Sequence, residues 1–240
     1  MKRSKINQII RRADEFIRSR GFYLPPFAYW QPDEWRSKGP EVSEIVENHL
    51  GWDITDFGKG DFDTEGLFLF TIRNGHSDNW ARQARSVPLG TGKLYAEKLL
   101  IEEDRQVTPM HFHWAKMEDI INRGGGTLAI QLYNASADEK LDDTPVQVSL
   151  DGVARTLDPG SVLRLSPGES ITLPPRLYHS FWAEGGRTLI GEVSLVNDDY
   201  RDNRFLDAPG RFPEIEEDEP PLYLLVTDYQ HFYGVKRGGA

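Results

Sequence analysis

Apolar and polar residues follow a helical period at the start of the chain and a different pattern after about residue 65. Over residues 4–20 the apolar positions are spaced by three and four, which places them on one helix face. We therefore predict a helix there, with Ser4 as its N-cap. A second, short helix is expected over residues 40–50, because Pro40 suits a first helical turn.

Short runs of apolar, aromatic and β-branched residues replace the helical period from about residue 65. Most of these runs are bounded by Gly, Pro, Asn or Asp, which is typical of strands joined by turns. The expected strands fall within residues 66–75, 92–103, 126–136, 145–157, 161–175, 178–184, 187–196 and 222–234. Short strands at this spacing favour an all-β sandwich or barrel.

The length and composition indicate one domain over residues 1–240. A chain of 240 residues with 38% hydrophobic content can bury one sizeable core. We expect a helical extension over residues 1–60, the β structure over 61–200, and a polar, turn-rich tail over 201–240. The N-terminal helices should pack outside the β structure.

Charge and residue content exclude several classes of function. The formal charge is -10, from 38 acidic and 28 basic residues, and no dense basic cluster is present. Because binding to phosphate backbones needs clustered Lys and Arg, nucleic acid is not an expected partner. No run reaches the roughly 18–20 apolar residues of a membrane span, and the first residues do not resemble a signal peptide. We therefore expect a cytoplasmic protein without a membrane partner.

The absence of cysteine narrows the chemistry further and directs attention to histidine. Without cysteine, disulfides, thiolate catalysis and Cys-ligated zinc are excluded. Two of the six histidines, His111 and His113, stand in the segment "MHFHWAKME". Residues i and i+2 of a strand point to the same face, so these two side chains can converge. Glu118 has the wrong parity for one straight strand and can join them only if a bend intervenes.

An isolated H-x-H pair is more often two ordinary strand histidines than a metal site, but a second segment changes this interpretation. His179 lies in "PGESITLPPRLYHSFW" and could supply a further ligand from a neighbouring strand. Imidazole and carboxylate groups together suit zinc, iron, manganese, nickel or copper. The remaining histidines, His49, His76 and His231, are interpreted as structural or exposed.

The two segments resemble the paired sequence motifs of the cupin superfamily. Three positions depart from those motifs: Arg105 and Arg176 stand where glycines are usual, and Ala183 stands where asparagine is usual. The departures concern turn and edge positions. The resemblance implies a small β-barrel that binds one divalent metal through a specific set of ligands. That set is His111, His113, Glu118 and His179.

The wider chain resembles the D-lyxose ketol-isomerase family within that superfamily. The segments that carry the resemblance are "LPPFAYWQPDEW", "GWDITDFGKGDF", "EVSLVNDDYRDNRF" and "GRFPEIEEDEP". It implies a homodimeric cupin barrel whose tail covers the site. It also implies an intramolecular oxidoreductase that interconverts D-lyxose and D-xylulose, and D-mannose and D-fructose, through an enediol. The expected cofactor is Mn²⁺, with zinc, cobalt, nickel or iron as alternatives.

Such an isomerase also needs an acid and a base. Lys98 alternates with apolar neighbours in an expected strand, so the pattern leaves it either inside the barrel or on the outer face; the family resemblance favours the site. The resemblance also implies an active-site carboxylate in the acidic tail, with Glu214 the first choice and Glu216 the second. Glu192, between apolar residues of a barrel strand, is the rival candidate.

Two other classes of function fit the same ligand set. A cupin dioxygenase would use the three histidines and the glutamate to hold iron or nickel. A non-catalytic sugar-binding cupin would bind a monosaccharide without turning it over. Oxygen uptake with bound iron would favour the first alternative, and saturable binding without product would favour the second.

Overall fold

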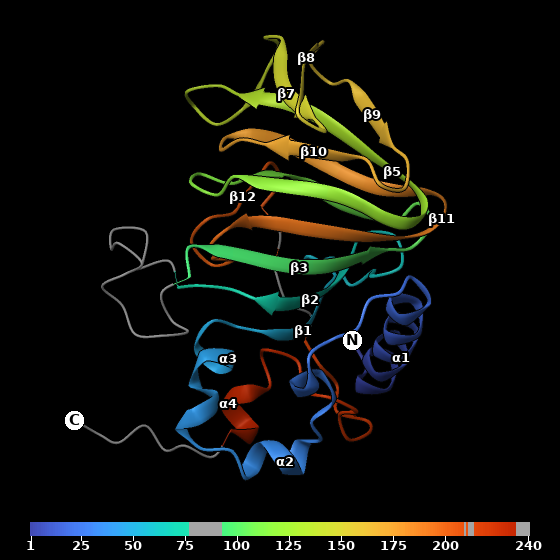
Figure 1. Ribbon diagram of the computed structural model, residues 1–240, viewed down its shortest axis with the longest axis vertical. Coiled ribbons are helices and arrows are strands. Elements are labelled where there is room, and N and C mark those ends of the chain that lie inside the picture. The colour runs from blue at the N-terminus through green and yellow to red at the C-terminus, as the bar shows by residue number, and fades with distance from the viewer. Residues whose placement is uncertain (77–92, 209, 211–213, 234–240) are drawn as a thin grey trace, which may run out of the picture.

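A twelve-stranded antiparallel sheet dominates the computed structural model, which describes residues 1–76, 93–208, 210 and 214–233 (Figure 1). The helices are α1 (Arg3–Ser19), η1 (Pro26–Tyr29), α2 (Pro32–Arg36), η2 (Pro40–Val42), α3 (Ser43–Glu47) and α4 (Tyr229–Phe232). The strands are β1 (Gly51–Thr55), β2 (Leu67–Arg73), β3 (Tyr95–Glu102), β4 (Val107–Phe112), β5 (Glu118–Ala135), β6 (Leu141–Asp142), β7 (Val146–Leu150), β8 (Val153–Leu157), β9 (Val162–Leu165), β10 (Ser170–Leu173), β11 (Leu177–Leu195) and β12 (Arg204–Phe205).

Two long strands hold the barrel together. The main strand order is β1-β2-β3-β11-β5-β10-β7-β8, and β4 lies against β11 and β12. The first part of β11 pairs with β4 and its last part with β3, while β5 lies beside it along most of its length. Both strands therefore pass from one layer of the barrel into the other.

Glycines allow these long strands to bend. At the bend of β5, Gly124 and Gly125 have φ values of 126° and 113°, a region that side chains with a Cβ rarely enter. A Cβ on Gly125 would also lie 2.1 Å from the carbonyl oxygen of Arg187. The "RGGG" sequence is therefore a requirement of this crossing point.

The barrel interior is filled by aliphatic and aromatic side chains from both layers. Strand residues alternate between the two faces, and the inward positions of β5, β10 and β11 form one cluster. Its fully buried members include Leu128, Ile130, Leu132, Ile171 and Ile190. This packed part fills one end of the barrel and leaves polar side chains to gather at the other.

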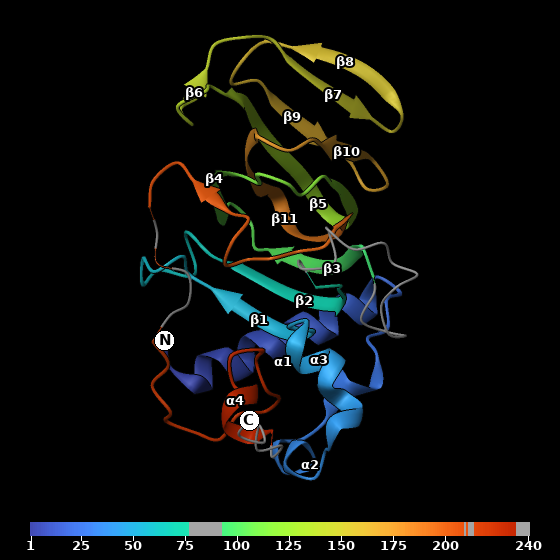
Figure 2. The ribbon, with the colours of Figure 1, turned by 90° about the vertical axis from the view of Figure 1, so that its left-hand side faces the viewer.

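Helix α1 covers the outer face of β1, β2 and β3, as Figure 2 shows. Its buried stripe, which includes Ile6, Ile10 and Ile17, packs against Trp52 and Phe70 of the sheet. The predicted helix and its position outside the barrel are confirmed. The predicted cap is wrong by two residues, because Lys2 is the N-cap and Ser4 is already helical.

Several predicted boundaries differ from the structure. Strand β1 lies before residue 61, within the segment expected to be a helical extension. The runs over 178–184 and 187–196 form one strand, β11, because the glycines between them bend the chain without ending its pairing. The segment 40–50 contains the short helices η2 and α3.

The predicted last strand over 222–234 is wrong. Within its described part the chain makes a turn and then α4. The Asp228 carboxylate accepts the backbone N–H of Leu225, and the Asp228 N–H donates to the Leu225 carbonyl. The segment makes one isolated parallel bridge, between Leu225 and Trp52, and the turn then ends the pairing. Residue 234 lies outside the described part.

The acidic part of the tail is attached to α1. Arg3 is 1% exposed and forms ion pairs with Asp228, at 2.9 Å, and Glu217, at 2.6 Å. Glu216 pairs with Lys2, and the Asp218 carboxylate accepts the N–H and hydroxyl of Ser4. The charge run "EIEEDE" is therefore a set of partners for the helix N-terminus. Among the described helices, none combines the length and apolarity that crossing a membrane requires.

Candidate metal centre and active site

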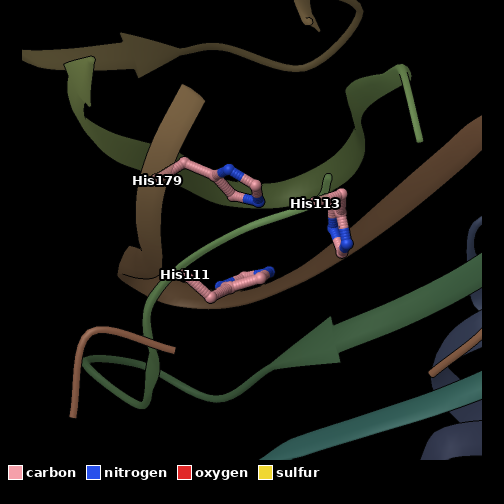
Figure 3. A group of neighbouring side chains, drawn as sticks. All are labelled: His111, His113 and His179. Atoms are coloured by element: carbon pink, nitrogen blue, oxygen red, sulfur yellow. The ribbon is translucent and has the colours of Figure 1, made fainter. Parts of the chain in front are cut away.

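Three buried histidines converge inside the barrel (Figure 3). His111 lies near the end of β4, His113 follows that strand, and His179 stands opposite His111 on β11. One ring nitrogen from each lies within 4.8 Å of the others. The convergence predicted from the H-x-H spacing and the downstream histidine is thus present in the structure.

Glu118 joins the histidines after a bend. Its Oε1 lies 3.3 Å from Nε2 of His113 and 3.1 Å from Nε2 of His179. Asp202 holds the bend, because its carboxylate accepts the backbone N–H groups of Ala115 and Lys116. The same residue lies in the tail, so the tail determines how the chain turns from the histidines to the glutamate.

The second ring nitrogen of each histidine faces a backbone carbonyl. Nδ1 of His111 lies 2.7 Å from the Pro109 oxygen, and Nδ1 of His113 lies 2.7 Å from the Asp202 oxygen. Nδ1 of His179 lies 3.0 Å from the oxygen of Leu177. A carbonyl oxygen only accepts, so each Nδ1 must carry the proton and each Nε2 presents a lone pair.

These lone pairs fit a cation. Nε2 of His179 is buried and has no hydrogen-bond partner among the described residues, although the Glu118 carboxylate is close. Two acceptors facing each other without a proton are unfavourable unless a positive charge lies between them. Burial, followed by the neighbouring histidines, lowers the pKa of His111 well below its ordinary value, which keeps that ring neutral. The three histidines could therefore hold a metal ion, and the Glu118 carboxylate lies beside two of them.

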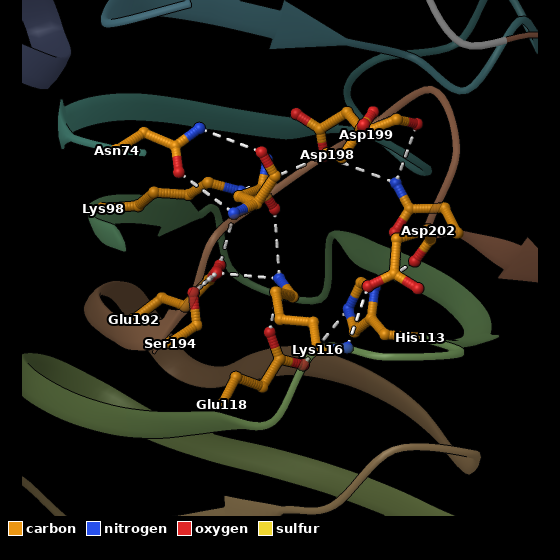
Figure 4. A network of polar contacts seen from close by, with 12 residues as sticks. Asn74, Lys98, His113, Lys116, Glu118, Glu192, Ser194, Asp198, Asp199 and Asp202 are labelled. Carbon is orange, nitrogen blue, oxygen red and sulfur yellow. Dashed lines mark hydrogen bonds and ion pairs between the residues drawn. The ribbon is translucent and has the colours of Figure 1, made fainter. Parts of the chain in front are cut away.

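Lys116 is a buried lysine that the sequence analysis did not single out. Its Nζ lies 2.7 Å from Glu118 Oε2 and 2.8 Å from Glu192 Oε1, so it bridges the two carboxylates (Figure 4). Burial alone would lower its pKa, but the two carboxylates outweigh burial and raise it. The sequence contained one indication of this position. Lys116 is two residues before Glu118, so in extended backbone the two side chains could point to the same face.

Lys98 and Glu192 stand opposite each other on β3 and β11 and both point inward. Their side chains are almost fully buried, with Nζ 3.7 Å from Glu192 Oε2 and 4.0 Å from Asp199 Oδ1. Burial would raise the pKa of Glu192, but the charges of Lys116 and Lys98 hold it below its ordinary value. Glu192 is therefore a carboxylate at neutral pH.

The carboxylate of Glu118 has the same kind of environment. Burial would raise its pKa, but the charge of Lys116 holds the pKa well below the usual range. The site thus keeps two ionised carboxylates beside two lysines, all nearly free of solvent.

The tail carboxylates chosen from the sequence lie elsewhere. Glu214 is exposed, and its backbone carbonyl accepts a hydrogen bond from the Met1 amino group. Glu216 is exposed and lies beside Lys2. Neither lines the cavity that contains the histidines. The cavity does receive a different part of the tail, since Asn203 and Phe205 line it.

The cavity has one polar and one apolar wall. Phe205 closes it by stacking on His111, with ring centroids 5.1 Å apart. The polar wall carries the histidines, the lysines and the carboxylates already described. The apolar wall consists of Phe57, Leu67, Leu69, Leu100, Ile120 and Phe181.

The fold and site define a class of protein, a cupin barrel with three buried histidines that could hold a metal ion. Solved structures agree on the fold. An L-ribose isomerase of Cellulomonas parahominis with L-ribose has a TM-score of 0.60 at 14% identity, over 90% of this chain and 98% of the other. An L-ribose isomerase of Acinetobacter in complex with L-ribose gives 0.58 at 14% identity, over the same shares.

Sequence comparison identifies the family. The family model described as D-lyxose isomerase matches residues 1–229. The chain is 48% identical to a D-lyxose/D-mannose isomerase of Escherichia coli, over 97% of this chain and 100% of the other. A D-lyxose/D-mannose isomerase of Serratia proteamaculans is also 48% identical, over 97% and 99%. The chain therefore belongs to the D-lyxose isomerase family, and it is an aldose–ketose isomerase.

Proposed function

We propose that this chain interconverts D-lyxose and D-xylulose, and D-mannose and D-fructose, by a metal-dependent proton transfer through an enediol. The observation that carries the proposal is the meeting of three histidine Nε2 lone pairs and the Glu118 carboxylate beside a second carboxylate and two lysines. The names of the two relatives support the choice of sugars.

The metal is held by His111, His113, His179 and Glu118 in this proposal. Bound there, a divalent cation would supply Lewis acidity to the oxygens of the open-chain sugar. We propose Mn²⁺ on the basis of the family resemblance, with zinc, cobalt, nickel or iron as alternatives that the same donors accept. The backbone carbonyls opposite each Nδ1 keep the rings in the tautomer that binds.

Glu192 is the base in this mechanism. It is ionised, it lines the cavity, and unlike Glu118 it does not contact the histidines. Such a carboxylate can take the proton from C2 of the aldose and return it to C1 of the enediol. This assignment replaces Glu214, which lies on the surface.

The two lysines have different parts. Lys116 bridges Glu118 and Glu192 and so fixes the base relative to the metal ligand. Lys98 lies 3.7 Å from Glu192. Its ammonium group donates hydrogen bonds to the sugar oxygens while the hydroxyl proton moves from O2 to O1. We therefore keep Lys98 as the acid.

A pair of isosteric variants tests the base. Glu192→Gln should lower kcat on D-lyxose by about 10²- to 10⁴-fold, the usual contribution of a general base, while the bound metal stays near the wild-type amount. Glu214→Gln is the matched control and should retain wild-type kcat. A ketose assay and metal analysis of both proteins give the answer. Wild-type kcat in Glu192→Gln, or a large loss in Glu214→Gln, would return the role to the tail.

We also propose that the protein works in the cytoplasm as a homodimer. The cysteine-free composition is consistent with that compartment, and the family resemblance implies the pairing. Sedimentation equilibrium checks the mass: a species of one chain's mass at working concentration would remove the dimer from the proposal.

A further inference from the structure

Strand β4 carries one more residue than its partner between two aligned pairs. His111 aligns with His179, and Thr108 aligns with Phe181, so β4 advances three residues while β11 advances two. The extra residue lies at Pro109 or Met110, and bulges are where proline is tolerated inside a sheet. Because of this bulge, Thr108 faces the cavity together with His111, although their odd spacing would otherwise separate them.

A buried carboxyl group stands behind Thr108. Glu102 is 0% exposed and ends β3 on the same face as Lys98 and Leu100, which line the cavity. Its Oε1 lies 2.5 Å from the Thr108 hydroxyl. Its Oε2 has no hydrogen-bond partner among the described residues.

Glu102 differs from Glu118 and Glu192 in having no ammonium beside it in the described part. The charged group that acts on it is Glu103, whose carboxylate pairs with Arg12 and Arg187. An ionised carboxylate with one unpaired oxygen in such a place is costly, whereas a neutral acid leaves only an uncharged group unpaired. Burial raises the pKa of Glu102 well above its ordinary value, in agreement with this geometry.

The contact with Glu102 leaves Thr108 a role in the cavity. The Thr108 hydroxyl donates its proton to Oε1 of Glu102, so the threonine oxygen keeps lone pairs that can accept a hydrogen bond from the cavity. Leu100 and Phe181, which also line the cavity, offer no hydrogen bond, so this hydroxyl is a polar group in an apolar wall.

We infer that Thr108 binds the sugar by accepting a hydrogen bond from one hydroxyl of the open-chain monosaccharide, and that Glu102, which accepts the Thr108 proton, positions Thr108 for this contact. The inference deepens the proposed function and rests on it. It assigns a substrate-selecting role to the apolar wall of the cavity and gives the β4 bulge a purpose.

Four variants test the assignment. Thr108→Val removes the hydroxyl at nearly constant volume and should raise KM for D-lyxose and lower kcat/KM by about tenfold, since one neutral hydrogen bond is lost. Thr108→Ser should retain most of kcat/KM. Glu102→Gln keeps an acceptor for the Thr108 hydroxyl and should stay within about threefold of wild type, whereas Glu102→Leu should resemble Thr108→Val. Bound metal should be unchanged in all four.

Deoxy sugars separate a binding role from a structural one. Among the 3-, 4- and 5-deoxy analogues of D-lyxose, one should show the same kcat/KM with wild type and Thr108→Val, because the hydroxyl that Thr108 contacts is already missing. An equal loss on every analogue, or wild-type kcat/KM for Thr108→Val on D-lyxose, would overturn the inference. So would a loss in Glu102→Gln as large as in Glu102→Leu.

Failure of the proposed function has a different signature. If the wild-type protein turned over neither D-lyxose nor D-mannose, the isomerase proposal would fail by itself. The Thr108 contact would then be measured as D-lyxose binding by calorimetry on the manganese-loaded proteins. Equal affinity of wild type and Thr108→Val, or no binding by either, would overturn it.

Discussion

Glu102 shows how one buried side chain can make stability depend on pH. Its raised pKa means that the folded protein keeps a proton which the unfolded chain releases above its ordinary pKa of about 4.3. In that window the unfolded state binds fewer protons, so the free energy of unfolding falls as pH rises. The contribution of Glu102 to the free energy of unfolding is complete below its pKa in the unfolded chain. It is lost as pH rises through its pKa in the folded protein.

Glu102→Gln should therefore change how the free energy of unfolding depends on pH, and should have less effect on its value at acidic pH. We expect the variant to gain free energy of unfolding relative to wild type between pH 5 and pH 8, because glutamine has no proton to release. Urea unfolding of both proteins across this range measures the difference, in which the other titrating groups cancel. Parallel curves would show that Glu102 is ionised in the folded protein.

Residue types and spacing predicted the converging groups well but not every role. The parity of His111 and His113, and the bend before Glu118, could be predicted from the sequence because strand geometry is local. The place of Glu214 could not, because it depends on how the tail meets α1. Arg105 and Arg176 occupy φ values of 64° and 63°, so these turns keep the left-handed conformation usual for glycine despite the substitutions.

At the scale of elements, α1 and the tail form a unit through Arg3. The guanidinium donates to both oxygens of Asp228 and of Glu217, while Asp228 also holds the turn before α4. Asp228 is nearly buried, whereas Glu217 is about half exposed. Loss of Arg3 would leave a buried carboxylate without a counter-charge.

Arg3→Ala should therefore lower the free energy of unfolding by about 3–5 kcal/mol, the usual cost of removing one partner of a buried pair. Lys5→Ala is the matched control on the same helix, because Lys5 pairs with Asp63 in the open and should cost no more than about 1 kcal/mol. Urea unfolding of the two variants gives both values. Equal small losses would mean that the tail is held by other contacts.

Element prediction failed where pairing is long-range. The helix over residues 4–20 was predictable because its apolar stripe is a local pattern. Strand β1 was hidden in the predicted extension, since its role follows from pairing with β2. The run over 222–234 has the residues of a strand, but its described part makes only one bridge, between Leu225 and Trp52, before the turn around Asp228 ends the pairing.

At the scale of the whole molecule, metal binding should stabilise the fold. The four proposed ligands come from β4, the residue after β4, β5 and β11, so they meet only in the folded state, and a cation bound there would stabilise that state by mass action. Manganese at 100 times its Kd should add about 2.7 kcal/mol to the free energy of unfolding. His179→Ala should lose most of this gain.

Thermal scans with manganese and with a chelator measure the effect. Weak binding of manganese to exposed carboxylates contributes a background shift in Tm. A Tm increase of the same size in wild type and His179→Ala would place the stabilising cation elsewhere on this acidic chain.

The all-β fold and the outer helices were predictable at this scale from patterns alone. How β5 and β11 divide their pairing between two layers was not, because that depends on contacts across the whole barrel.

The path of β11 also fixes when the site can come into being during synthesis. Its last part pairs with β3, a strand made many residues earlier, and its first part carries His179. Non-local pairing of this kind is slow and waits for both partners. A growing chain that has exposed His111, His113 and Glu118 still lacks both His179 and Glu192. Only a chain that has been synthesised through β11 offers the complete donor set. A product that ends earlier therefore cannot bind the cation in the same way.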